Sequence, residues 1–174
     1  MNRLKGFTII EIMTTLLIAS ILIGYAMPSI QQLQLNNLMN SERNRLTSSL
    51  YFARYYAITH QYNVIICPSL TSRNCDNQSN WHQGWMVFRD DNKNRQLDED
   101  EILLKSEDAM KNDVIATSSR YRQKIRYNSM GFSPGTNLSI NFCDFRGKEY
   151  AKSIIISNAG RIKQSKPIAD KVCN

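Results

Sequence analysis

The stretch MNRLKGFTIIEIMTTLLIASIL, Met1–Leu22, opens the chain with two basic residues, a long apolar run and one carboxylate inside that run. From Phe7 to Ile30 there are 24 residues, of which only Glu11 is charged. As a helix this run would be about 36 Å long, enough to cross the hydrocarbon core of a bilayer. A carboxylate inside a membrane-spanning helix costs about 2–3 kcal/mol or more, so Glu11 is expected to have a partner.

The flanking charges predict how the segment is oriented. Arg3 and Lys5 precede the apolar run, and no charged residue follows it until Glu42. This bias places the N-terminus in the cytoplasm and the rest of the chain on the other side of the membrane. A cleaved secretory signal would have a shorter apolar core and an A-x-A-like site, and neither is evident. The segment is therefore predicted to be a membrane anchor.

The motif KGFTIIEI, Lys5–Ile12, resembles the class III signal of type IV prepilins and type II secretion pseudopilins. The resemblance implies that a prepilin peptidase cuts after Gly6 and that the new terminal residue, Phe7, is N-methylated. It also implies that Glu11 neutralises the terminal amine of a neighbouring subunit during assembly. The expected location is the bacterial inner membrane, crossed once, with a periplasmic C-terminal domain that is assembled into a pilus or pseudopilus.

A helical pattern continues beyond the apolar run. Apolar residues at spacings of three, four or seven predict an amphipathic helix over residues 31–60, with its charged residues in water. They are Leu35, Met39, Leu46, Leu50, Ala53 and Ala57; the charged residues between them include Glu42, Arg43, Arg45 and Arg54. A continuous helix would run from Phe7 to about Thr59 with a kink at Pro28, and two helices hinged there are the alternative.

After Gln61 the pattern changes to short apolar runs separated by Asn, Ser, Gly and Pro, which predict antiparallel strands. The runs are NVIIC, GWMVFR, EILLK, KIRYN, LSINFC and KSIIIS. We expect an α+β fold in which the amphipathic half of the helix packs on an antiparallel sheet or pair of sheets. The expected divisions are a leader at 1–6, a transmembrane and assembly helix at 7–30, the amphipathic half at 31–60 and a β-rich domain at 61–174.

Several segments of this region, in order, resemble the GspH/FimT branch of pilins and pseudopilins. They include LTSSLYFARYYAITHQYNVIICPS, GWMVFRDDNKNRQLDEDEILL and SNAGRIK. Members of this branch are type II secretion pseudopilins or minor type IV pilins, and some of the latter bind DNA during natural transformation. The resemblance predicts a minor pilin in pilus biogenesis and DNA uptake. The alternatives are a structural tip pseudopilin of type II secretion and a minor pilin that only primes assembly. Expected partners are other pilins, the peptidase, the inner membrane and double-stranded DNA.

The segment GRIKQSK, Gly160–Lys166, resembles the GRxR element of the DNA-binding minor pilins. Gly160 can adopt the positive φ of a tight turn, and a following strand would point Arg161 and Lys163 to the side opposite Ile162. Lys166 adds a further charge. Lys163 departs from the pattern, because lysine lacks the planar fork with which arginine grips phosphate. The alternative is a solvated hairpin tip.

A second basic segment, SRYRQKIRYN, alternates cations with other residues. As an extended strand it would place Arg120, Arg122, Lys124 and Arg126 on one face, where they could neutralise phosphates. An edge strand protected from aggregation by its charges is the alternative. Whether this segment lies beside Gly160 is not readable from the sequence. The basic charge belongs to residues 109–174, which hold 12 basic and 4 acidic side chains.

Residues 90–108 hold 8 acidic and 3 basic side chains and include a partial match to a calcium loop. Counted from Asp90, oxygen-bearing side chains fall at the third, fifth, ninth and twelfth positions: Asn92, Asn94, Asp98 and Glu101. Arg95 occupies the sixth position, where calcium loops have glycine. We therefore expect a polar hairpin loop, with calcium as a weak alternative.

The four cysteines, Cys67, Cys75, Cys143 and Cys173, lack the spacing of a zinc site. In an exported domain they would form two disulfides. Of the three possible pairings we prefer Cys67 with Cys75 and Cys143 with Cys173; free thiols are the alternative for a cytosolic domain. The sequence has no serine elbow, phosphate loop or nucleophile with a suitably spaced histidine, so neither an enzyme nor a cofactor is expected.

Overall fold

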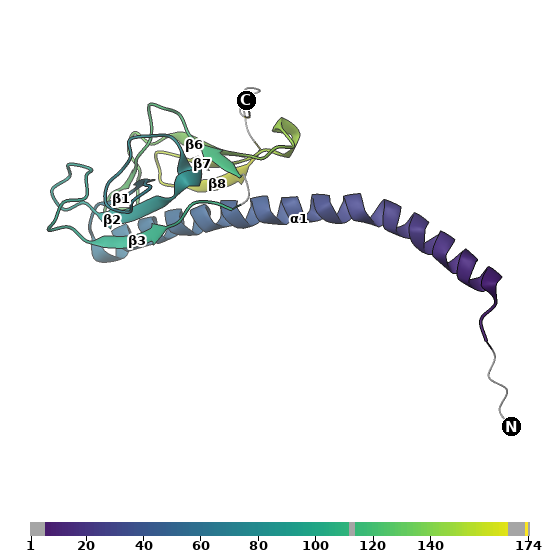
Figure 1. Ribbon diagram of the computed structural model, residues 1–174. Coiled ribbons are helices and arrows are strands. Elements are labelled where there is room, and N and C mark those ends of the chain that lie inside the picture. The colour runs from purple at the N-terminus through teal and green to yellow at the C-terminus, as the bar shows by residue number, and fades with distance from the viewer. Residues whose placement is uncertain (1–5, 112–113, 167–172, 174) are drawn as a thin grey trace. The chain divides into compact units, whose positions relative to one another are not determined.

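The computed structural model describes residues 6–111, 114–166 and 173, and it contains one long helix, α1 (Ile9–His60) (Figure 1). The helix is continuous through Pro28, so the alternative of two hinged helices is wrong. The chain divides into two compact units, Met1–Asn37 and Leu38–Asn174, and α1 contributes to both. The expected leader lies outside the described residues except for Gly6.

In the first unit the helix begins at Ile9, because the preceding residue forms a capping box. The Thr8 backbone nitrogen and hydroxyl both donate to the Glu11 carboxylate at 2.8 Å, and the Glu11 backbone nitrogen donates to the Thr8 hydroxyl at 3.4 Å. This reciprocal pair satisfies donors that every helix N-terminus leaves free. Thr8 therefore gives Glu11 a hydrogen-bond partner within the chain, whereas the expected partner from a neighbouring subunit stays a prediction.

The apolar part of α1 has the length and composition of a membrane span, and its most apolar window has no buried residue within the described structure. Large apolar side chains are exposed all along it, from Phe7 at 86% to Leu33 at 60%. Such a surface is not stable in water as a free face, so a bilayer or other helices must cover it.

The second unit contains two four-stranded antiparallel sheets, which we call sheet A and sheet B (Figure 1). Sheet A has the order β3-β2-β1-β5, built from β1 (Val64–Pro68), β2 (Trp85–Arg89), β3 (Leu103–Glu107) and β5 (Ile125–Tyr127). Sheet B has the order β4-β6-β7-β8, built from β4 (Ile115–Thr117), β6 (Leu138–Cys143), β7 (Lys152–Ile156) and β8 (Ile162–Ser165). Two short 3-10 helices, Trp81–Gln83 and Lys148–Tyr150, precede β2 and β7.

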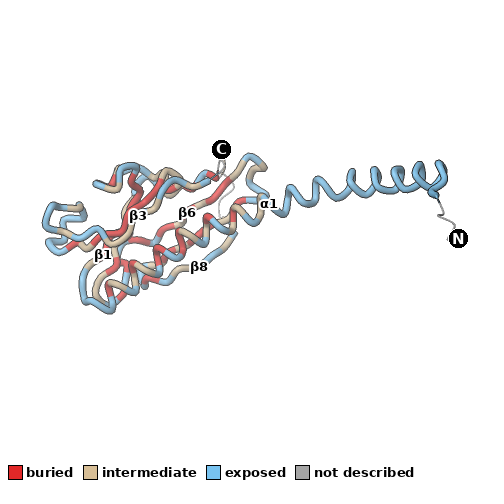
Figure 2. The backbone as a smooth tube through the Cα atoms, turned by 60° about the horizontal axis from the view of Figure 1, so that its bottom comes forward, coloured by how far each residue is buried: buried red, intermediate tan, exposed pale blue. Residues whose placement is uncertain are grey.

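The core lies between the second half of α1 and the two sheets. The apolar buried stripe of the helix consists of Met39, Leu46, Leu50, Ala53 and Ala57, as the spacing predicts, whereas Leu35 of the predicted stripe is only half-buried. It shares one cluster with strand residues of both sheets, and Figure 2 shows the buried positions on the helix and the strands. Burying each large apolar side chain contributes about 1.5–3 kcal/mol, which neither helix nor sheets could obtain alone. The expected α+β fold is confirmed.

Glu42 corrects the sequence analysis, which placed it in water. Its side chain is only 3% exposed, and it pairs with Arg45 at 2.9 Å and accepts a hydrogen bond from the Lys111 nitrogen at 3.4 Å. Arg45 also binds Glu107 at 3.1 Å and lies over the Trp85 ring. Glu42 can be buried because an arginine one turn later and a loop amide replace its water.

Candidate nucleic-acid interface

The turn that joins β7 to β8 has a conformation that only glycine fits. Gly160 has φ +72°, and its nitrogen donates to the Ser157 carbonyl at 2.8 Å. A Cβ on Gly160 would lie 2.0 Å from the Gly131 carbonyl oxygen. The positive φ expected from the sequence is therefore present, and the close approach to Gly131 adds a second requirement. Arg54 joins the two segments, because its guanidinium donates to the Gly131 carbonyl at 3.0 Å and to the carbonyl of Ala159, the residue before Gly160, at 3.4 Å.

The first residues after the turn present two cations outward. Ile162 packs against the core and Gln164 donates to Asn44 and Thr47 of α1, so this side of β8 faces the helix. Arg161 and Lys163 are exposed and line a hollow of about 450 Å³, which Ile155, Ser157 and Ile162 also line. Within the described residues, neither cationic group has a hydrogen bond or an ion pair. Lys166 is also exposed, and its carbonyl accepts the Ser153 hydroxyl at 3.1 Å.

The second basic segment is not the extended strand that we expected. Arg120 and Tyr121 form a turn, residues 122–124 are irregular, and only Ile125–Tyr127 pair as β5. The strand prediction for 120–124 is therefore wrong, because the backbone must turn there to carry the chain from β4 in sheet B to β5 in sheet A. The four cations consequently do not share one face.

Two cations of this segment are engaged by backbone carbonyls. Arg122 donates to the Asn137 carbonyl at 2.8 Å and Lys124 donates to the Arg95 carbonyl at 2.9 Å. Burial, and then the neighbouring charge of Arg95, hold the pKa of Lys124 below its usual value, although Asp90 opposes this. Arg126 is half-buried. These groups are less available to a phosphate than their number suggests.

The two basic segments are linked indirectly, through the loop that follows β5 and the turn at Gly160. Gly131, four residues beyond β5, packs directly on Gly160. Farther along, the Asn137 residue that accepts Arg122 donates its nitrogen to the Asn158 side chain at 3.0 Å. Arg122 and Arg161 therefore border the same pair of loops.

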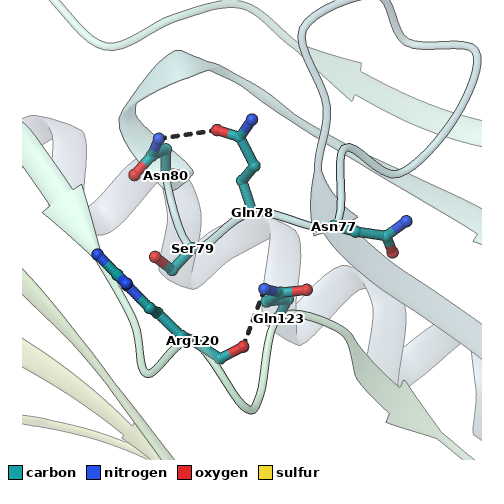
Figure 3. A pocket seen from close by; sticks show the side chains of 6 residues that line it. All are labelled: Asn77, Gln78, Ser79, Asn80, Arg120 and Gln123. Atoms are coloured by element: carbon teal, nitrogen blue, oxygen red, sulfur yellow. Dashed lines mark hydrogen bonds between the residues drawn. The ribbon is translucent and has the colours of Figure 1, made fainter.

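Arg120 lies apart from these contacts and lines a separate hollow of about 280 Å³ (Figure 3). The other lining residues, Asn77, Gln78, Ser79, Asn80 and Gln123, carry amides and one hydroxyl. The sequence analysis did not single out these polar residues. The signal available was the density of Asn, Gln and Ser in DNQSN, which indicates a loop without naming what lies opposite it.

Both disulfides have the preferred pairing, Cys67–Cys75 and Cys143–Cys173. In the acidic loop the calcium candidates bind one another and the backbone. The side chains of Asn92 and Asn94 each donate to Asp98 at 2.6 Å, and Arg95 takes the glycine position with φ +63°. The carboxylates of Asp90 and Glu101 accept backbone amides. Among the residues that the structure describes, no group of three or more His, Cys, Asp or Glu side chains could hold a metal ion.

Two parts of the chain match known protein families. Residues 42–160 match the family model "Type II transport protein GspH", and residues 1–27 match the prokaryotic N-terminal methylation motif. A search of curated proteins finds no match.

Two crystal forms of the type IV minor pilin FimU from Pseudomonas aeruginosa are similar in fold. One has 19% sequence identity and a TM-score of 0.58, and covers 74% of this chain and 89% of its own. The other has 19% identity and a TM-score of 0.55, and covers 72% and 91%. Because the GspH model spans most of the chain and the methylation motif its start, the chain belongs to the GspH family of pilins and pseudopilins.

Proposed function

We propose that this chain is a minor type IV pilin whose C-terminal domain binds DNA through the Gly160 turn and β8. The observation that carries the proposal is the pair of exposed, unpartnered cations, Arg161 and Lys163, that border one hollow in the described structure. Among the described residues, none of those that line this hollow carries a carboxylate. A cation without a counter-ion keeps its full attraction for a phosphate, whereas a paired one must first give up its partner.

The geometry supports contact with the sugar–phosphate backbone rather than with base edges. The turn is rigid, because Gly160, Gly131 and Arg54 fix one another, and β8 is held to the helix by Gln164. This support fixes the backbone of Arg161 and Lys163, so the backbone does not have to become ordered when DNA binds. Contacts of this kind position a duplex without reading its sequence, so affinity should depend on salt and little on base composition.

The proposal includes maturation and assembly. Peptidase cleavage after Gly6 would create a methylated Phe7, and residues 7–30 would cross the inner membrane, with residues 31–60 and 61–174 in the periplasm. In the described structure Glu11 caps its own helix. In a fibre the same carboxylate would exchange Thr8 for the terminal amine of a neighbour, a charged donor that forms a stronger hydrogen bond than a neutral one.

The test uses the full-length processed protein in detergent and a labelled DNA duplex of mixed sequence. Affinity is measured by fluorescence anisotropy at about 50 mM and about 200 mM salt, over which DNA-binding proteins lose much of their affinity. Arg161→Ala should weaken binding about tenfold and reduce the salt slope by about one phosphate contact. The matched control is Arg73→Ala, which removes another exposed arginine, from the loop between β1 and β2. No binding at the lower salt, or equal losses in both variants, would reject the proposal.

A second candidate function is supported by the description of the matching family model, a type II transport protein. As a pseudopilin the chain would be a structural component of the secretion machine, without a nucleic-acid role. Deleting the gene separates the two. Loss of transformation with secretion intact supports the DNA-binding pilin, and loss of exoprotein secretion with transformation intact supports the pseudopilin.

A further inference from the structure

A second polar site, separate from the proposed duplex-binding surface, is the hollow that Arg120 lines (Figure 3). We call it the amide pocket, and its lining residues are Asn77, Gln78, Ser79, Asn80, Arg120 and Gln123. Its described lining combines one guanidinium with four primary amides and includes no carboxylate. Its volume of about 280 Å³ is just below the usual range for small-molecule sites, so it limits a ligand to about one nucleotide.

The walls of the amide pocket are fixed by the backbone. The Ser79 carbonyl accepts the Ser118 nitrogen at 3.0 Å, and Asn80 forms a β-bridge with Thr117. The Ser118 hydroxyl accepts the Trp81 indole at 3.0 Å and donates to the Arg122 carbonyl at 3.2 Å. The Cys67–Cys75 disulfide anchors the loop that leads into Asn77. The two walls, residues 77–80 and 120–123, are therefore held in place before any ligand arrives.

The polar groups of the amide pocket are only partly used. Asn80 donates to the Gln78 oxygen at 3.0 Å and Gln123 donates to the Arg120 carbonyl at 2.9 Å, as Figure 3 shows. These bonds orient the amides and leave the Gln78 nitrogen and the Gln123 oxygen without a protein partner in the described structure. The Arg120 guanidinium likewise has none there. A ligand would meet donors and acceptors together with one positive charge.

An exposed aromatic residue, Tyr121, lies in the chain between two residues that line the amide pocket, Arg120 and Gln123. Tyr121 follows Arg120 in the turn and its side chain is 96% exposed, the highest value among the large hydrophobic side chains. A tyrosine ring at a turn between two arginines has no packing role. Bases stack on such rings in proteins that bind single strands, and stacking is worth about 1–3 kcal/mol per base.

We propose that the amide pocket binds one unstacked nucleotide of single-stranded DNA, with Arg120 on its phosphate, the amides on its base edge and Tyr121 on its base face. This inference rests on the proposed DNA binding and adds a second mode to it. A base in a duplex has both its faces stacked and its pairing edge occupied, so neither Tyr121 nor the amides could reach them. The Gly160 surface would hold a duplex, and the amide pocket would hold a frayed end or separated strand.

The test compares three probes on the full-length protein in detergent: a single-stranded oligonucleotide, the same sequence as a duplex, and an abasic strand of equal length. Tyr121→Ala should weaken single-strand binding about tenfold. It should leave duplex and abasic binding within about twofold, because they offer no free base. Phe145→Ala is the matched control, since it removes another ring that is 76% exposed and should change no probe. Gln123→Ala should weaken binding of the single-stranded oligonucleotide and leave binding of the other two probes unchanged.

The outcomes separate this inference from the proposed function. If Arg161→Ala weakens duplex binding while Tyr121→Ala affects no probe, the amide pocket is rejected and the duplex surface stands. If Tyr121→Ala weakens all three probes equally, the ring has a structural role and the inference is wrong. A protein that binds no probe rejects both proposals. If a sulfated polysaccharide displaces the single strand and its own binding depends on Tyr121, the pocket recognises a glycan.

Discussion

The chain carries two basic segments of similar composition, Arg120–Arg126 and Gly160–Lys166, whose charged groups meet different surroundings. In the first segment, Arg122 and Lys124 donate to backbone carbonyls of other loops. In the second, Arg161 and Lys163 have no partner among the described residues. The difference arises from the backbone carbonyls that lie within reach of each cation. Irregular loops leave carbonyls without ladder partners, and these accept hydrogen bonds from nearby cations, whereas the Arg161 and Lys163 side chains meet no such carbonyl among the described residues. Positive charge in a sequence therefore overestimates the charge available to a ligand.

The largest expected effect tests the rigidity of the second segment. In Gly160→Ala the new Cβ would meet the Gly131 carbonyl at 2.0 Å, at a residue with φ +72°. Together these should cost about 3 kcal/mol of unfolding free energy, or a fall of about 10 °C in melting temperature. Thermal melts followed by tryptophan fluorescence measure the change.

Gly147→Ala is the control for this change. It has φ +86° with no atom within 4 Å, so it has the backbone strain but no collision. It should cost about 1–2 kcal/mol. Equal losses in the two variants would show that the contact between Gly160 and Gly131 does not stabilise the turn.

The next effect exchanges the roles of two arginines. Arg122→Met removes a hydrogen bond of 2.8 Å to the Asn137 carbonyl and should lower the unfolding free energy by about 1 kcal/mol. Arg161→Met removes no contact of its side chain in the described residues and should change it by less than about 0.5 kcal/mol. For duplex affinity the order should reverse, with the larger loss at Arg161. Urea titration and anisotropy on the same preparations give both values, and the same ranking in both assays would contradict the comparison.

Much of the second segment could be predicted from the sequence because its pattern is local. The positive φ of Gly160 and the opposite sides of Ile162 and Lys163 follow from the residue types and the two-residue period of a strand. The capping box at Thr8 and Glu11 was equally readable, since T-x-x-E before an apolar run is its signature. It was overlooked because the membrane cost of Glu11 suggested an external partner.

The first segment could not be predicted, for a physical reason. Two of its cations, Arg122 and Lys124, are held by the Asn137 and Arg95 carbonyls, which come from loops 15 and 29 residues away. Nothing within residues 120–126 indicates them. The burial of Glu42 could not be predicted for the same reason, since it depends on a hydrogen bond from Lys111, 69 residues away. β4 was missed because three residues of alternating type are too short to carry a periodic signal.

A smaller effect concerns the pH dependence of Lys124. Because burial and Arg95 lower the pKa of its ammonium group, the unfolded chain binds this proton more tightly than the folded one. Stability should therefore rise with pH between the lowered value and the ordinary value of about 10.4. Over this alkaline range, the melting temperature of the wild type should rise relative to that of Lys124→Met. Lys163→Met, which changes an exposed lysine, should stay parallel to the wild type. A constant difference for Lys124→Met would mean that its ammonium is solvated.

The smallest effect lies at the end of the first segment, where Tyr127 is fully buried and its hydroxyl has no partner in the described residues. Tyr127→Phe removes this unsatisfied group and should leave the unfolding free energy unchanged or raise it by up to about 1 kcal/mol at neutral pH. Burial raises the pKa of Tyr127 far above its ordinary value of about 10. Above that pH the unfolded chain loses the proton while the folded chain retains it, so the wild type should lose stability and the variant should lose less. Melts across this range compare it with Tyr55→Phe, an exposed site that should follow the wild type. If Tyr127→Phe destabilises the chain instead, the hydroxyl has a partner such as an ordered water, and β5 is held by a polar contact as well as by packing.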